Sequence, residues 1–398
     1  MNLLHKLSRG YCLALLSSLF IISILDTQAQ ELQINHGPYL QYVTTTEATV
    51  VWTTNKNSIS WVEFYEEDGS NFYAKERPKA FASEDGLKTI GKIHKVTLEG
   101  LKPTTKYAYR VYSHEVVAHK QRNSLLGETT ATRVYKSRPL YFSTLDPDQE
   151  STSFVLLTDV HEQPDKVGAL LEDTDFESTD FVIMDGDFMN DFNEEKNLFE
   201  GSIDTLTQIF AKELPLYIVR GNHETRGVMG HLLKDYFHFP DGKYYYTFSY
   251  GDTFFIVLDS GEDKADSDIE YSGLVDFDAY RTKEAEWLNR VVNSEQYRKA
   301  RHRIVFSHIP PYGGGQWHGD IEMQNKFVPI LNKAGIDLMI CGHTHRYSFV
   351  EANPGRNEFP ILICSNTAKA NVQVTPEKIT VTTVDMNKKV LSTLVFDK

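Results

Sequence analysis

Five apolar runs in this 398-residue chain each end in a short polar motif. In order, the runs with their motifs are FVLLTDVH, FVIMDGD, PLYIVRGNHE, RIVFSH and DLMICGHTH. Short apolar runs are typical of buried strands, and the strands of an α/β sheet bring their carboxyl ends to one edge. We therefore expect the motifs to meet at a single site, formed by Asp159, His161, Asp187, Asn222, His223, Glu224, His308, His343 and His345.

The spacing of the first and last motifs favours a metal site. Asp159 and His161 are two residues apart, as are His343 and His345. On an extended chain this spacing directs both side chains of a pair to the same side, where they can bind the same ion. Carboxylate and imidazole ligands without a thiolate suit Zn, Mn or Fe, and the ligand type does not select among them.

The two middle motifs add a bridging carboxylate and a histidine for chemistry. Asp187 follows a glycine that permits a tight turn, so we favour it over Asp185 as a carboxylate shared by two ions. Asn222 offers an uncharged amide oxygen as a ligand. His223 cannot easily share its metal, so we expect it to act on the substrate, with Glu224 orienting its imidazole. A turn with a helix N-cap at Asn222 is the alternative.

His308 leads into the loop IPPYGGG, which is rich in Pro and Gly. Such a loop can shape a substrate pocket. Tyr312, Trp317 and His318 in this stretch are candidate substrate contacts, and ordinary loop packing is an equal alternative.

Residues 1–29 have the pattern of a cleaved signal peptide. Lys6 and Arg9 precede an apolar run from Tyr11 to Leu25, and Thr27-Gln28-Ala29 suits a signal peptidase. A membrane anchor is the alternative, but the run is shorter than a bilayer span. We expect a secreted or periplasmic protein without integral membrane association.

The mature chain is acidic and has two cysteines. Removing Lys6, Arg9 and Asp26 lowers Lys+Arg from 41 to 39 and Asp+Glu from 55 to 54, which leaves a net charge near −15. A surface with this negative charge repels nucleic acids, so we expect no nucleic-acid scaffold as a partner. A phosphate group could bind only where the protein provides a local positive centre. Cys341 and Cys364 can form a disulfide after export or remain as buried thiols.

Two domains are expected after the signal peptide. Residues 30–147 have the pattern of a β-sandwich domain, with short strands rich in aromatic and β-branched residues. A Leu-x-Pro turn before Tyr107 resembles the tyrosine corner of fibronectin type III sandwiches. Residues 145–153 have linker composition. From 152 to 398, strands alternate with helical patterns and the tail returns to strands, which predicts an α/β two-sheet sandwich.

The ordered motifs resemble those of the calcineurin-like metallophosphoesterase superfamily from about Ser153 to the C-terminus. With the N-terminal sandwich, the chain is most similar to the purple acid phosphatase-like branch. The resemblance implies that Asp187 bridges two ions and that His223 is the general acid. It gives one ion the further ligands Asp159, His161 and His345, and the other ion Asn222, His308 and His343.

The resemblance implies an exported phosphatase that hydrolyses small phosphate monoesters through a metal-bound hydroxide. The alternative is hydrolysis of phosphodiesters, with nucleotides or lipid headgroups as substrates. A third hypothesis is an exported binding module that has the fold but no catalytic activity. True purple acid phosphatases have Gly where this chain has His161, and a metal-binding Tyr where it has Asn190. We therefore expect a colourless or weakly coloured enzyme. The sequence does not indicate its oligomeric state.

Overall fold

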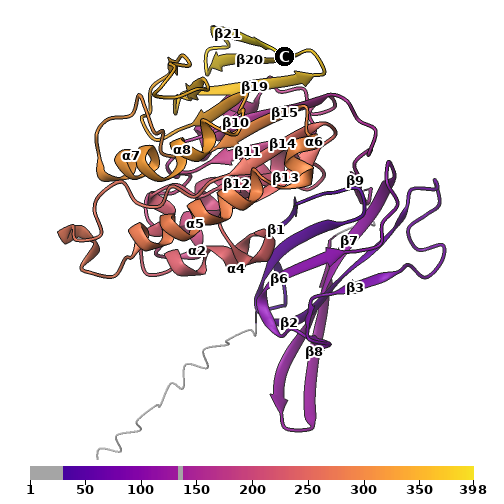
Figure 1. The fold of residues 1–398 in the computed structure, drawn as a ribbon. Helices are drawn as coiled ribbons and strands as arrows, with labels where there is room; N and C mark the ends of the chain where they lie inside the picture. Colours follow the sequence, from indigo (N-terminus) through magenta and orange to yellow (C-terminus); the bar gives the residue numbers. More distant parts are fainter. Residues whose placement is uncertain (1–29, 133–137) are drawn as a thin grey trace, which may run out of the picture. The chain divides into compact units, whose positions relative to one another are not determined.

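The computed structural model describes residues 30–132 and 138–398. The expected signal peptide, residues 1–29, lies outside the described residues, and the chain from Leu32 onward forms one compact unit. Among the described residues, no helix has the length and hydropathy needed to cross a membrane. Figure 1 shows an all-β region followed by a region of mixed strands and helices, as the sequence predicted.

The all-β region is built around one long strand, β2 (Ala48–Glu66). Its first half pairs with β1 and β6, and its second half pairs with β7 and β3. Val50 and Trp52 from the first half and Val62 from the second share one core, so β2 passes between two layers of a sandwich. The other strands are β1 (Ile34–Gln41), β3 (Lys79–Phe81), β4 (Ser83–Glu84), β5 (Leu87–Lys88), β6 (Gly91–Leu98), β7 (Lys106–Lys120), β8 (Asn123–Ala131) and β9 (Leu140–Ser143).

The tyrosine corner is present. The Tyr107 hydroxyl accepts a hydrogen bond from the backbone N–H of Lys102 at 2.9 Å, which ties the turn before β7 to the strand. Strand β8 folds back along β7, and the two strands form an antiparallel ribbon.

Two six-stranded mixed sheets make up the α/β region, as predicted. In the first sheet β10, β11 and β12 are parallel, and in the second β14, β15, β16 and β18 are parallel. The first sheet contains β12 (Leu216–Val219), β11 (Phe181–Asp185), β10 (Thr152–Leu157), β19 (Ala368–Thr375), β20 (Lys378–Asp385) and β21 (Val390–Asp397). The second contains β13 (Tyr246–Tyr250), β14 (Thr253–Val257), β15 (His302–Phe306), β16 (Leu338–Cys341), β18 (Ile361–Ile363) and β17 (Ser348–Val350).

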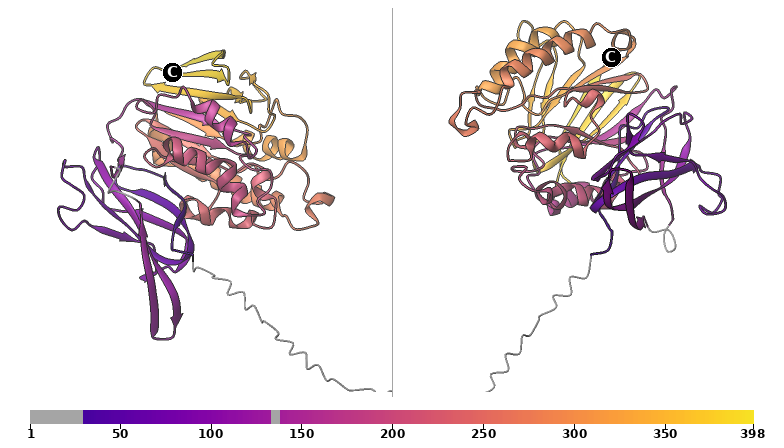
Figure 2. Two further views of the ribbon diagram at one scale, coloured as in Figure 1. Left: turned by 180° about the vertical axis from the view of Figure 1, so that it is seen from behind. Right: turned by 90° about the horizontal axis from the view of Figure 1, so that it is seen from below.

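The helices cover the outer faces of the paired sheets (Figure 2). On the first sheet lie α1 (Pro164–Leu171) and a continuous helical stretch of α2 (Glu195–Leu198), η1 (Phe199–Ile203), α3 (Asp204–Leu206) and η2 (Thr207–Ala211). On the second lie α5 (Phe277–Val291), α6 (Glu295–Lys299), α7 (His318–Glu322), η7 (Met323–Phe327) and α8 (Val328–Leu331). Short turns of helix are η3 (His223–Thr225), η4 (Gly230–Leu232), α4 (Leu233–Tyr236), η5 (Pro240–Gly242) and η6 (Ile269–Tyr271).

Alternation along the strands separates the two faces of each sheet. On β14, Phe255 faces the core between the sheets, whereas Phe254 faces α5 to α8. Between the sheets the ring of Phe154 lies 5.0 Å from that of Phe181 and 5.6 Å from that of Phe306. Each fully buried aromatic side chain contributes roughly 2–3 kcal/mol, so this core fixes the sheets and the edge at which their parallel strands end.

The two cysteines are buried and free, which confirms the thiol alternative. Tyr39 of β1 and Val51 of β2 belong to the same buried cluster as strands and helices of the α/β region, so the all-β region packs directly on the α/β region. The boundary between residues 147 and 152 stays a prediction.

Candidate functional site

The motif residues follow the ends of neighbouring parallel strands, as expected. Leu157 of β10 is in register with Met184 of β11, and Phe306 of β15 with Ile340 of β16. Within each sheet the motifs therefore begin at the same level, and the ligand clusters described below bring the turns of both sheets together at one edge.

The backbone of these turns differs from the prediction. Asp159, His161, Asp187, His343 and His345 all have positive φ, between 47° and 72°. The two-residue spacing therefore does not act through an extended chain, and that expectation is wrong. A left-handed conformation is uncommon outside glycine and costs energy. It turns the chain back after β10, β11 and β16, so that the polar side chains of these three turns converge on one point.

Four of the predicted ligands form one cluster. The ligand atoms of Asp159, His161, Asp187 and His345 all lie within 4.8 Å of one another. His345 Nε2 is 3.1 Å from Asp159 Oδ1 and 2.9 Å from His161 Nε2. His161 Nε2 is 3.9 Å from Asp187 Oδ2.

A second cluster shares Asp187 with the first. It consists of Asp187, His308 and His343, whose ligand atoms also lie within 4.8 Å of one another. His308 Nε2 is 3.0 Å from Asp187 Oδ2. The Asn222 side-chain oxygen lies 3.1 Å from His343 Nδ1, so Asn222 adjoins this cluster. The preference for Asp187 over Asp185 agrees with this geometry.

Backbone carbonyls set the direction of two imidazoles. His308 Nδ1 donates to the Asp185 carbonyl at 2.7 Å, which leaves Nε2 facing Asp187. His223 Nδ1 donates to the Asn190 carbonyl at 2.6 Å, which directs Nε2 toward the site, 3.9 Å from Asp187 Oδ2. Fixing one ring nitrogen of a histidine in this way selects the tautomer and the orientation of the other nitrogen.

Glu224 has a role other than the one predicted. Its carboxylate accepts hydrogen bonds from the backbone N–H groups of Asp187 and Gly221 at 2.8 Å, and from Phe188 and Met189. The buried Glu224 therefore joins the turn after β11 to the turn after β12. The Asn190 carbonyl, and not Glu224, orients His223, which corrects our expectation.

Burial and charge act in opposite directions on the shared carboxylate. Burial alone would raise the pKa of Asp187, but the neighbouring His308 holds it well below its usual value. Burial likewise favours neutral His308, yet Asp187 and Asp159 raise its pKa well above the ordinary value. Burial and the charge of His308 lower the pKa of His343 to about 4. The site therefore concentrates negative charge beside ring nitrogens suited to bind a cation.

The donor atoms fit divalent metal ions. Within the described residues, Asp159 Oδ1 and His308 Nε2 are buried and make no hydrogen bond, although each has a charged neighbour, His345 Nε2 at 3.1 Å and Asp187 Oδ2 at 3.0 Å. Buried polar atoms are rarely left unpaired, and two ions would account for them, one ligated by Asp159 in the first cluster and the other by His308 in the second. Carboxylate, imidazole and amide donors in two groups with a shared carboxylate match the donor set expected from the sequence.

The sequence did not reveal that Arg226 adjoins His223 or that Glu262 is the partner of Arg226. Arg226 Nη1 lies 3.3 Å from His223 Nε2, and the Arg226 guanidinium pairs with Glu262. The only sequence signal was the position of Arg226, two residues after the GNHE motif.

The loop after His308 makes other contacts. His318 Nε2 lies 2.7 Å from Asp278 Oδ1 on α5, and Tyr312 packs beneath the guanidinium of Arg356. Trp317 is 56% exposed. Loop packing therefore accounts for Tyr312 and His318.

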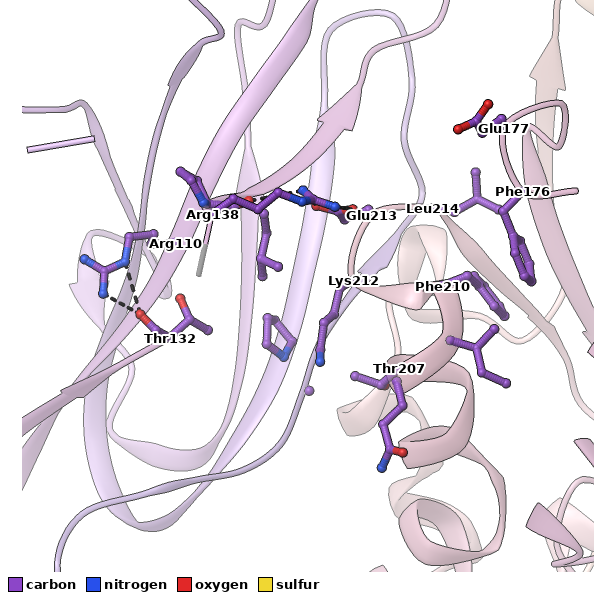
Figure 3. Close-up of a pocket in the computed structure, with 16 residues that line it drawn as sticks. Arg110, Thr132, Arg138, Phe176, Glu177, Thr207, Phe210, Lys212, Glu213 and Leu214 are labelled. Carbon is purple, nitrogen blue, oxygen red and sulfur yellow. Dashed lines mark hydrogen bonds and ion pairs between the residues drawn. The ribbon is translucent and has the colours of Figure 1, made fainter. Parts of the chain in front are cut away.

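A cavity of about 710 Å³ lies apart from the predicted site (Figure 3). Its wall includes Arg138 and Glu213, joined by an ion pair with Nη2 and Oε2 2.6 Å apart, and Phe210 of η2. The predicted ligands are not among its lining residues, so this cavity is separate from the candidate metal site.

Two protein families match this chain. Residues 152–347 match the calcineurin-like phosphoesterases, and residues 36–125 match the N-terminal domain of purple acid phosphatases. Purple acid phosphatase 18 of Arabidopsis thaliana is 22% identical over 332 residues, which are 78% of this chain and 65% of the relative. The chain thus spans less than two thirds of the length of that relative.

The chain is also similar to solved structures. GAP50, described as the anchor in the inner membrane complex of Plasmodium, has 16% identity and a TM-score of 0.44, covering 63% of this chain and 89% of its own. Yfce, a phosphoesterase from E. coli, has 11% identity and a TM-score of 0.29, covering 61% and 98%.

Proposed function

Because the chain combines a calcineurin-like phosphoesterase domain with a purple acid phosphatase N-terminal domain, we propose that it is a metal-dependent phosphoric ester hydrolase acting on phosphate monoesters. The observation that carries this proposal is the pair of ligand clusters joined through Asp187, with His223 beside them. A shared carboxylate suits two adjacent ions, and a neighbouring imidazole suits proton transfer to a leaving group.

The seven predicted ligands divide between two ions. Asp159, His161 and His345 would hold one ion with Asp187, and Asn222, His308 and His343 would hold the other with the same Asp187. When bound, the ions would supply an activated water and a positive centre for phosphate within an acidic protein. Zn, Mn and Fe all accept this donor set. With His161 and Asn190 in place of the Gly and Tyr of purple enzymes, the loaded protein should have little visible colour.

The protein groups then act on the ester itself. His223 in its protonated form donates from Nε2 to the leaving oxygen, and the Asn190 carbonyl holds the ring in the required orientation. Glu224 keeps the turns that bear Asp187 and Asn222 at a fixed separation through its backbone hydrogen bonds.

Metal analysis and an ester panel on one purified sample test this proposal. We expect about two ions per chain and faster hydrolysis of a chromogenic monoester than of a diester with the same leaving group. Faster diester hydrolysis would favour the phosphodiesterase alternative. A metal-loaded protein that hydrolyses neither class would instead be a binding module.

We also propose that the chain is exported and loses residues 1–29. Mass spectrometry of the protein recovered outside the cytoplasm should give an N-terminus at Gln30. An intact Met1 on that protein would contradict cleavage.

A further inference from the structure

Arg226 occupies the boundary between the candidate metal centre and solvent. It follows η3, and its side chain is 22% exposed. Its Nη1 lies 3.3 Å from Nε2 of His223, the nitrogen proposed to protonate the leaving group. Nη1 therefore points to the place where a substrate oxygen would approach His223.

Glu262 fixes the other edge of this guanidinium. Arg226 Nε donates to Glu262 Oε1 at 3.0 Å, and Nη2 donates to Oε2 at 2.9 Å. Glu262 is only 1% exposed, and Thr225 and Tyr271 also donate to its carboxylate at 2.6 and 2.9 Å. A bidentate pair to a buried, fully bonded carboxylate holds an arginine in one geometry. The pairing uses Nε and Nη2 and leaves Nη1 on the side of His223.

The segment that carries Glu262 is itself held by a buried side chain. Arg281 of α5 is fully buried, and it donates to the carbonyls of Ser260, at 2.8 Å, and of Glu262. The chain of contacts from α5 to His223 thus places Arg226 on a rigid support. Such support is typical of groups that must meet a substrate with fixed geometry.

We propose that Arg226 is a substrate-binding residue whose Nη1 donates to a terminal oxygen of the phosphoryl group, and that it favours monoesters over diesters. This inference rests on the proposed function of the same site. Once a phosphate oxygen takes over as the acceptor for Nη1, Nε2 of His223 no longer has to accept from Arg226 and is free to carry the proton for the leaving oxygen.

The preference for monoesters follows from the number of acceptors. A phosphomonoester has three terminal oxygens and up to two negative charges, whereas a diester has two terminal oxygens and one charge. Asp263 also contacts Nη2, at 3.3 Å, so the charge of Arg226 is largely balanced by two carboxylates. Arg226 therefore acts through a hydrogen bond to the third terminal oxygen, which only a monoester has. Its net charge contributes little to the attraction of anions.

The test compares Arg226→Gln with Lys264→Gln in the metal-loaded protein. Lys264 pairs with Glu270 on the same segment, so its replacement removes the same charge without changing a contact to His223. We expect Arg226→Gln to lower kcat/KM for a chromogenic monoester by about tenfold or more, the worth of one charged hydrogen bond. Hydrolysis of the matching diester should fall much less, and Lys264→Gln should leave both substrates near wild type.

Binding of inorganic phosphate, measured by calorimetry, gives a readout independent of turnover. Affinity should fall about tenfold in Arg226→Gln with metal content unchanged. Equal losses for monoester and diester, or wild-type phosphate affinity in the variant, would overturn the inference. A wild-type protein that binds metal but neither hydrolyses esters nor binds phosphate would refute the proposed function itself, so the two failures are distinguishable.

Discussion

At the scale of single residues, the proposed chemistry depends on the direction in which His223 presents its two ring nitrogens. Nδ1 donates to the Asn190 carbonyl, so Nε2 is the nitrogen available to a leaving group. We expect His223→Ala to lower kcat by about 100-fold or more, the usual worth of a general acid. Metal content should not change, because the proposed ligands are untouched. Metal analysis beside steady-state kinetics checks this, and loss of metal would show that His223 is a ligand.

Asp187 gives the complementary prediction because it belongs to both clusters. Asp187→Ala should reduce the metal content at both positions, whereas His345→Ala should affect one. Elemental analysis after dialysis measures the difference. Full metal retention in Asp187→Ala would be inconsistent with a bridging carboxylate.

At the scale of elements, the turn after β16 has no room for a side chain at Gly342. A Cβ there would lie 2.0 Å from Thr158 Oγ1 and 2.8 Å from Asp159 Oδ2. Gly342→Ala must therefore separate the turns after β10 and β16, and we expect lower metal content together with a lower Tm. Gly168→Ala is the matched control, because a Cβ at this position in α1 meets nothing within 4 Å. An alanine there should leave metal content unchanged and stabilise the helix by up to about 1 kcal/mol. If both variants bind metal normally, the close approach at Gly342 is not important.

The same turns show what the sequence could and could not predict. The apolar runs identified the strands and the common edge, because burial requires only composition and length. The left-handed backbone of Asp159 and His343 was not predictable, since this conformation is uncommon for residues other than glycine and tertiary contacts select it. Glu262 was missed because it lies 36 residues after Arg226, and only the folded sheet brings the two together.

At the scale of the whole molecule, the all-β and α/β regions share buried contacts. The Tyr109 hydroxyl donates to the Lys212 carbonyl at 2.6 Å, and Lys95 Nζ donates to the Phe237 carbonyl at 2.8 Å. We expect calorimetry to show one unfolding transition. Tyr109→Phe should lower the free energy of unfolding by about 1–3 kcal/mol, because the Lys212 carbonyl loses the hydroxyl that donates to it. Tyr107→Phe, which loses a bond within the all-β region, should lower the same transition. Two separate transitions would contradict this prediction.

Acid should weaken the whole fold through a histidine far from the metal centre. His94 is 1% exposed beside Trp52, and its Nε2 donates to Thr54 Oγ1 at 2.8 Å, because that hydroxyl itself donates to the Lys56 carbonyl. Within the described residues, His94 Nδ1 is buried without a hydrogen-bond partner. A proton on Nδ1 would place a charge in the core, so burial lowers the pKa of His94 from 6.5 to about 4.

The direction of the pH effect follows from this lowered pKa. Well above pH 6.5 His94 is neutral in both the folded and the unfolded protein, and its burial costs no stability. As the pH falls toward 4 the unfolded chain binds a proton that the folded chain does not, so stability is lost. We expect His94 to lower the free energy of unfolding by about 2 kcal/mol as the pH falls from 7 to 5. His94→Gln keeps an N–H donor but cannot titrate, so its free energy of unfolding, measured with urea, should depend less on pH by that amount. Since the metal-centre groups are the same in both proteins, their titration cancels in the comparison. Equal pH slopes would mean that His94 is protonated in the folded protein as readily as in the unfolded chain.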